Sequence, residues 1–81
     1  MQVPRFPVDA PQQRVLRAFA QLGFVVVRHR EHISLMRERP GGGRDTLTIP
    51  NHPRISSGTL RAACSQGNIP RDAFIDAYER S

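Results

Sequence analysis

Residues 24–50 read FVVVRHREHISLMRERPGGGRDTLTIP, and this stretch decides the fold. Its first part, residues 24–30, is rich in β-branched side chains, which favour extended backbone. Residues 32–38 then alternate, so that Ile33 and Leu35 point to one side and the residues between them to the other. The pattern predicts two successive strands with one buried face.

A turn and a third strand follow. Residues 40–43 are one proline and three glycines, a composition typical of a turn. Residues 46–49 alternate again, with Leu47 and Ile49 on the core side. The loop at residues 50–53 contains two prolines, which cannot donate ladder hydrogen bonds and so end the strand. These residues complete a predicted three-stranded antiparallel sheet.

A helix is expected before the sheet. Residues 11–22 place apolar side chains at helical spacing, with Pro11 suited to the first position and Gly23 to a left-handed cap. The preceding residues 1–10 hold two prolines and little periodicity, so we expect an extended N-terminal arm whose first residues are disordered.

Helical patterns also follow the sheet. Ser56 or Ser57 is expected to cap a second helix that Gly67 terminates, and a last helix is expected to start at Pro70. The element order predicts an α+β fold, a two-layer α-β-β-β-α sandwich with the helices on one face of the sheet, formed by residues 11–81 as one domain. The period of two leaves these side chains on the open face: His32, Ser34, Met36, Thr46 and Thr48.

The charge of the chain points to a polyanionic partner. Its formal net charge is +5 over 81 residues, and all twelve basic residues are arginine. The planar guanidinium group binds phosphate through two donors at once. Residues 28–61 hold seven arginines against three acidic residues, so the middle of the chain is expected to face the polyanion.

Other features exclude several classes of protein. The single cysteine, Cys64, falls on the apolar face of the second helix and is expected to be a core residue rather than a reactive thiol. No paired Cys/His spacing occurs, so no metal or cofactor is predicted. The longest apolar run is far shorter than the roughly 20 residues of a membrane span, and no signal peptide precedes it, so a cytosolic protein without a membrane partner is expected.

Several short segments resemble the HicA family of mRNA-interferase toxins. They occur in the family's order, at compatible spacings and on the predicted elements. The segments are Leu22-Gly23-Phe24, Val27-Arg28, His32-Ile33, Leu47-Thr48-Ile49-Pro50 with His52, Gly58-Thr59-Leu60-Arg61, and Ile69 through Phe74. The resemblance implies a fold similar to the double-stranded RNA-binding domain, endonucleolytic cleavage of mRNA that halts growth, and neutralisation by a HicB-type antitoxin that covers the open sheet face.

The resemblance makes His32 the candidate catalytic residue. RNA carries its own nucleophile, the 2′-hydroxyl, so cleavage needs a base, an acid and cations rather than a metal. Histidine side chains titrate near neutrality and therefore suit either proton-transfer role. Metal-independent transphosphorylation is the resulting hypothesis, and its second proton-transfer group stays open among His29, His52, an arginine and water.

Two groups of residues are candidates for holding RNA. The first group is four arginines of the middle region, which can contact phosphates. The second lies at the start of the predicted second helix and combines one arginine with small and hydroxyl-bearing residues. The first group is Arg28, Arg30, Arg37 and Arg54, and the second is Arg61 with Ser57, Gly58 and Thr59. The alternatives are solvated surface charge for the arginines and helix capping for the residues before Arg61.

Two other functions fit the same pattern. A catalytically silent module of this fold would bind double-stranded RNA by shape and phosphate contacts. Arg30-Glu31 favours that alternative, because HicA toxins usually carry Gly-Ser, or similar small residues, before the histidine. A protein-interaction domain would instead use the open sheet face to dock a partner.

Overall fold

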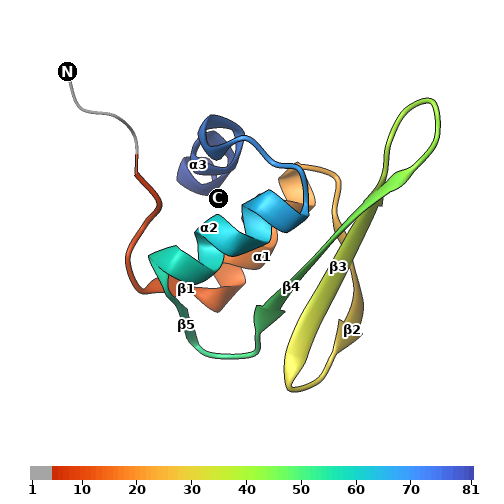
Figure 1. The fold of residues 1–81 in the computed structure, drawn as a ribbon. Coiled ribbons are helices and arrows are strands. Elements are labelled where there is room, and N and C mark those ends of the chain that lie inside the picture. The colour runs from red at the N-terminus through yellow and green to blue at the C-terminus, as the bar shows by residue number, and fades with distance from the viewer. Residues whose placement is uncertain (1–4) are drawn as a thin grey trace.

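The chain folds into three helices packed on one side of a three-stranded sheet, as Figure 1 shows. The structure, a computed structural model, describes residues 5–81. Its elements are β1 (Ala10–Pro11), α1 (Gln12–Gln21), β2 (Val25–His29), β3 (His32–Glu38), β4 (Arg44–Pro50), β5 (Arg54–Ile55), α2 (Ser57–Gln66) and α3 (Arg71–Glu79). The predicted α+β class and element order are confirmed.

The sheet has the predicted antiparallel order β2-β3-β4. Ile33 lies opposite Ile49 and Leu35 opposite Leu47, and all four side chains are buried beneath the helices. On the other face of these strands His32, Thr46 and Thr48 are exposed, and Ser34 and Met36 are half-buried. One covered and one open face follow directly from the period of two.

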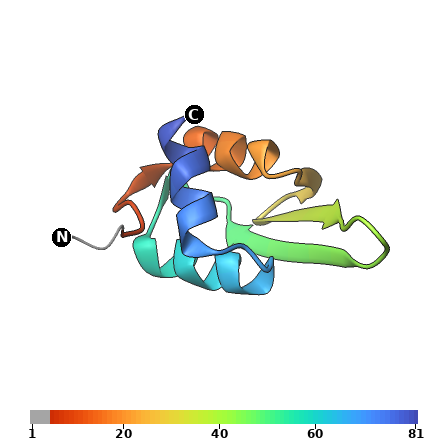
Figure 2. The same cartoon turned by 90° about the horizontal axis from the view of Figure 1, so that it is seen from above.

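The core lies between this sheet and the helices, whose arrangement is visible from above in Figure 2. The Phe19 ring of α1 lies 5.2 Å from Phe74 of α3 and 6.0 Å from Phe24, measured between centroids. α2 packs along β4 and α1 against α3. An aromatic cluster therefore joins the first and last helices to the start of the sheet.

The helix boundaries follow local chemistry. The Ser56 hydroxyl accepts a hydrogen bond from the Thr59 amide at 3.1 Å, which caps α2. Gly23 has a φ of 93°, the left-handed conformation expected after α1. Gly67 has a φ of −86° and is needed for a different reason: a Cβ there would lie 2.8 Å from the Leu47 side chain. Close packing, not a left-handed turn, requires glycine after α2.

A second, two-stranded sheet was not predicted. Ala10 of β1 pairs with Ile55 of β5, and both side chains are buried. Phe6 also packs against the core, with its ring 6.0 Å from Phe74. The part of the arm that follows Phe6 is therefore attached to the helical layer, while the expected disorder of the first residues lies partly outside the described chain. Two-residue strands carry no periodic signal that a sequence can reveal.

Candidate functional site

His32 begins β3 at the end of the sheet where the β2–β3 turn lies. Its side chain is exposed, whereas the next residue, Ile33, is fully buried. Alternation along β3 therefore directs the imidazole to the open face, away from the helices. A long polyanion can reach this imidazole without any rearrangement of the core.

The imidazole lies in a shallow depression with a volume of about 480 Å³. The depression is lined by Arg28, Arg30, Glu31, His32 and Ser34. Two guanidinium groups thus flank the histidine, and the one carboxylate is that of Glu31. The local charge is positive overall, although Glu31 lowers it.

A β-bulge brings Arg28 to the side of His32. Val26 pairs with Leu35, but Arg28 pairs with Ser34, so the register shifts between them and Val27 is the extra residue. Strict alternation from Val26 would direct Arg28 toward the helices. The bulge instead places Arg28 on the open face, in the same pleat row as Ser34 and next to His32.

Asn51 supports the turn that carries Arg30 and Glu31, a contact that no pattern in the sequence indicates. Its Nδ2 donates to the Arg30 carbonyl at 2.8 Å, and its backbone N–H donates to the Glu31 carbonyl at 3.0 Å. Gln12 Nε2 in turn donates to Asn51 Oδ1 at 2.7 Å and to the His52 carbonyl at 3.0 Å. The first residue of α1 and the loop after β4 therefore fix the turn before His32.

The other two histidines lie elsewhere. His29 pairs with Ile33 and is thus directed to the helix-facing side of the sheet, although its side chain is exposed at the edge strand. His52 is exposed in the loop after β4, and its contact with Gln12 uses the backbone carbonyl. Neither lines the His32 depression. Arg54, on β5, is exposed and also lies outside it.

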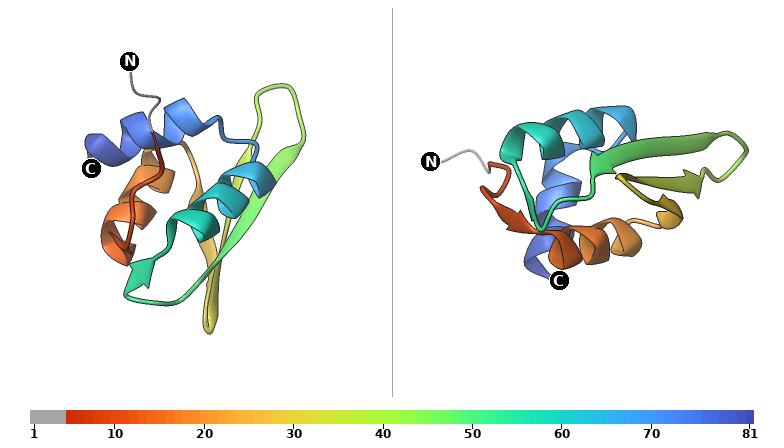
Figure 3. Two further views of the ribbon diagram at one scale, coloured as in Figure 1. Left: turned by 60° about the vertical axis from the view of Figure 1, so that its left-hand side comes forward. Right: turned by 90° about the horizontal axis from the view of Figure 1, so that it is seen from below.

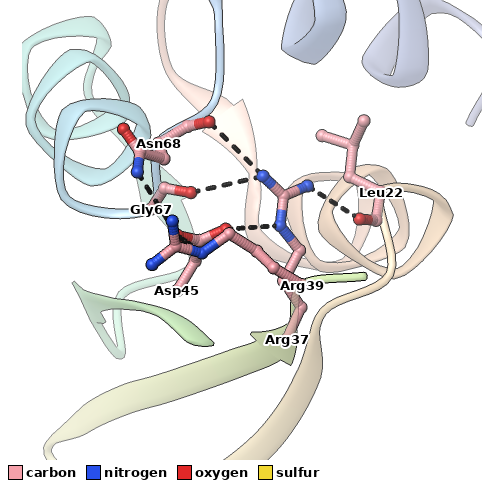
Figure 4. Close-up of polar contacts among 6 residues, drawn as sticks. All are labelled: Leu22, Arg37, Arg39, Asp45, Gly67 and Asn68. Carbon is pink, nitrogen blue, oxygen red and sulfur yellow. Dashed lines mark hydrogen bonds and ion pairs between the residues drawn. The ribbon is translucent and has the colours of Figure 1, made fainter. Parts of the chain in front are cut away.

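Arg37, one of the candidate phosphate contacts, has hydrogen-bond partners within the protein. Its Nε donates to Asp45 at 3.0 Å, and its remaining nitrogens donate to the carbonyls of Leu22 at 3.0 Å and Asn68 at 3.3 Å. The guanidinium also lies over the Phe24 ring, 4.6 Å from its centroid. Figure 4 shows the hydrogen bonds of Arg37 to Asp45, Leu22 and Asn68. These donors already have partners within the protein, so the structure gives Arg37 fewer free donors for a phosphate than an unpaired arginine would have.

The sequence held a signal for the contacts of Arg37. Arg37 has the same parity in its strand as Ile33 and Leu35, and Asp45 has the same parity as Leu47. The two residues are also direct register partners, so the helix-facing side of the hairpin ends in an ion pair. The side chain of Asp45 is only 3% exposed. Its hydrogen bond with Arg37 lowers the pKa of this carboxyl below the ordinary 3.8, against the opposing effect of burial.

The predicted helix-start group lies apart from His32. Arg61 and Ser57 line another depression, together with residues of the N-terminal arm and of α3. The Thr59 amide and hydroxyl both bond to the Ser56 hydroxyl, so Thr59 takes part in capping. Gly58 is exposed beside them. The candidate contacts therefore divide between the open sheet face and the helical layer.

Cys64 is a core residue, as expected. It is buried on α2, and burial raises the pKa of its thiol to about 12. The thiolate needed for nucleophilic or redox chemistry is thus disfavoured. Within residues 5–81, no three histidine, cysteine or acidic side chains gather closely enough to hold a metal ion.

Comparison with known protein families assigns the chain. The HicA toxin family of bacterial toxin–antitoxin systems matches residues 13–69, more than half of the chain. The chain belongs to the HicA toxin family. The match includes the His32 turn, the Arg37 contacts and the start of α2. No curated protein and no solved structure shows a significant match. None of the helices described in this HicA-family chain is long and apolar enough to cross a membrane.

Proposed function

We propose that this HicA-family chain is an endoribonuclease that cleaves mRNA in the cytoplasm and inhibits growth. The observation that supports the proposal is the exposed His32 imidazole, flanked by Arg28 and Arg30 in one depression on the open sheet face. A proton-transfer group next to two phosphate-binding cations supplies part of what RNA transphosphorylation requires, and the second proton-transfer group stays open.

The proposed reaction uses the substrate's own 2′-hydroxyl. His32 removes the 2′-hydroxyl proton as a base, or protonates the departing oxygen as an acid. The 2′ oxygen attacks phosphorus while the bond from phosphorus to the 5′ oxygen breaks, which leaves a 2′,3′-cyclic phosphate and a 5′-hydroxyl. Arg28 and Arg30 stabilise the negative charge that develops on the phosphoryl oxygens. The other proton-transfer group stays open between an arginine, water and His52; His29 points to the helix-facing side.

The proposed partners are mRNA and a HicB-type antitoxin. The open face presents His32 and Arg28 with no helix in front of them, so an antitoxin that covers this face would block access to the imidazole. Arg54 remains a candidate for additional phosphate contact, as do Arg61, Ser57, Gly58 and Thr59. The reaction as proposed needs no metal ion.

The test compares RNA cleavage by the native protein, His32→Ala and His29→Ala in the presence of a chelator. His29 provides a matched control, because it is a second exposed histidine three residues away that points to the other side of the sheet. We expect His32→Ala to lower the cleavage rate by about 10²–10⁴-fold and His29→Ala to retain it. Products of the native reaction should carry 2′,3′-cyclic phosphate ends.

Two results would contradict the proposal. Equal cleavage by His32→Ala and the native protein removes His32 from the reaction, and cleavage that the chelator abolishes removes metal independence. If the native protein binds RNA but never cuts it, the silent RNA-binding alternative is correct. Coexpression of a HicB-type protein should relieve the growth arrest caused by the native chain.

A further inference from the structure

Three arginines lie together at a site remote in sequence from His32. A depression of about 450 Å³ is lined by Arg5, Phe6, Val8, Ser57, Arg61 and Arg71. Its arginines come from the N-terminal arm, α2 and the first residue of α3. The left view of Figure 3 shows these three segments on the same side of the molecule.

The positive charge of this depression is not neutralised by the described protein. The ion pairs within residues 5–81 use Arg37, Arg39 and Arg80, so none involves Arg5, Arg61 or Arg71. Among the described residues, no carboxylate lines the depression. The neighbouring arginines Arg37 and Arg39 differ in this respect, because both form ion pairs with Asp45. Three arginines that line one depression without a neighbouring carboxylate favour binding of an anion.

Arg61 and Arg71 are carried by helices of the packed fold, and Arg5 directly precedes a part of the arm that is packed. Phe6, next to Arg5, packs against Phe74, and Ala10 pairs in the two-stranded sheet, so the arm between them is attached at both ends. Arg61 follows Ser57 by four residues, which places both on one side of α2. Arginines held on packed elements lose less conformational freedom when they bind than arginines on a free tail.

We propose that Arg5, Arg61 and Arg71 form a second phosphate-binding site that holds the backbone of the RNA chain outside the His32 depression. The inference rests on the proposed function for the identity of the ligand. Each guanidinium fork can bind a phosphate through two donors, and the Ser57 hydroxyl adds another. The aromatic ring of the site is already packed against Phe74, which favours sequence-independent phosphate contact over recognition of bases or of an apolar peptide anchor.

The test measures binding of an mRNA-length transcript as a function of salt, in proteins that also carry His32→Ala so that the RNA stays intact. Arg61→Gln and Arg71→Gln are compared with Arg17→Gln, which removes the same charge from an exposed arginine of α1 that does not line this depression. We expect each site variant to lower affinity about threefold to tenfold and to reduce the salt slope by about one counterion. Arg17→Gln should change both less.

A dinucleotide separates failure of this inference from failure of the proposed function. It is too short to span a molecule whose longest dimension is 37 Å, so its cleavage by the native protein reports on His32 alone. If Arg61→Gln and Arg71→Gln bind the transcript like Arg17→Gln, the second site does not hold RNA, whatever the dinucleotide result. Binding of inorganic phosphate and of polyglutamate is measured in the same variants. If the site variants lose binding of either anion but bind the transcript normally, the site holds another anion and the inference is wrong.

Discussion

Arginines near the two ends of strand β3 differ in the partners that the fold gives them. At the start of the strand, Arg28 and Arg30 flank the exposed His32 and line an open depression. At its other end, Arg37 is bound to Asp45 and to backbone carbonyls, and its side chain is 23% exposed. The difference arises from the face of the sheet. Arg28 reaches the open face through a bulge, whereas Arg37 points into the helix-facing side, where unpaired charge is costly.

The comparison shows that an arginine's role depends on the partners that the fold provides. Arg37 meets carbonyls at the ends of α1 and α2, together with a buried carboxylate. In the turn before His32, Asn51 donates a hydrogen bond to the backbone carbonyl of Arg30, and this bond does not involve the Arg30 side chain. We therefore expect substitutions at one end of β3 to alter stability and substitutions at the other to alter RNA chemistry.

The largest effect on stability is expected from Arg37→Met. The variant leaves backbone carbonyls of Leu22 and Asn68 without their charged donor and leaves Arg39 as the only cation paired with the buried Asp45, so the free energy of unfolding should fall by about 2–4 kcal/mol in denaturant titrations. Arg39→Met is the control, because that side chain is 51% exposed and makes one ion pair of 3.3 Å. Its substitution should lower the free energy of unfolding by less than about 1 kcal/mol. Native-like stability of Arg37→Met with weakened RNA binding would reverse the comparison.

Asn51→Ala is expected to affect the His32 end next most strongly. Without its amide the turn loses one hydrogen bond to Arg30, so we expect kcat to fall about tenfold to a hundredfold with little change in KM. The free energy of unfolding should fall by about 1 kcal/mol. Gln66→Ala is the matched control. Gln66 Oε1 accepts a hydrogen bond from the Thr48 backbone N–H at 3.1 Å, away from the turn. Equal losses of kcat in both variants would show that Asn51 has no specific positioning role.

Much of this arrangement was predictable from the sequence. The alternation of residues 32–38 gave the bounds of β3, and the same period placed His32 on the open face. The position of Arg37 on the helix-facing side was also predictable, because it follows Ile33 by an even number of residues in the same strand. The bulge at Val27 was not, since three consecutive valines offer no signal for where the register shifts.

The brace at Asn51 shows the other limit of sequence reasoning. Asn51 follows a proline in a loop, a position that fits a turn residue as well as a tertiary contact. Its bonds to Arg30 and Gln12 join segments 21 and 39 residues away along the chain. Such contacts depend on how the elements pack, and local patterns carry no record of them.

A smaller effect is expected from the open-face arginines. Arg28→Gln and Arg30→Gln should each lower RNA affinity about threefold to tenfold and reduce the salt slope by roughly 0.7–0.9, since each removes one phosphate contact. Filter binding at several salt concentrations measures both quantities. Thermal unfolding should remain unchanged, because neither side chain is buried. A loss of stability comparable to that of Arg37→Met would contradict the assignment.

The last prediction concerns Asp45, whose contribution to stability changes with pH only in acid. Because its pKa is lowered in the folded state, the carboxylate stabilises the fold fully above its ordinary value of 3.8, and this stabilisation is lost as the pH falls through the lowered value. Asp45→Asn should therefore show a weaker loss of stability in that acidic range than the native protein. Parallel acid titrations of the two proteins would contradict the assignment of the shift to Asp45.

The central claim is tested most directly by the single-turnover cleavage rate at saturating RNA, measured for His32→Ala and Arg37→Met at a temperature where both are folded. Saturation removes differences in affinity, and the folded state removes differences in stability. We predict a loss of about 10²–10⁴-fold for His32→Ala and a near-native rate for Arg37→Met. A near-native rate for His32→Ala would contradict the account.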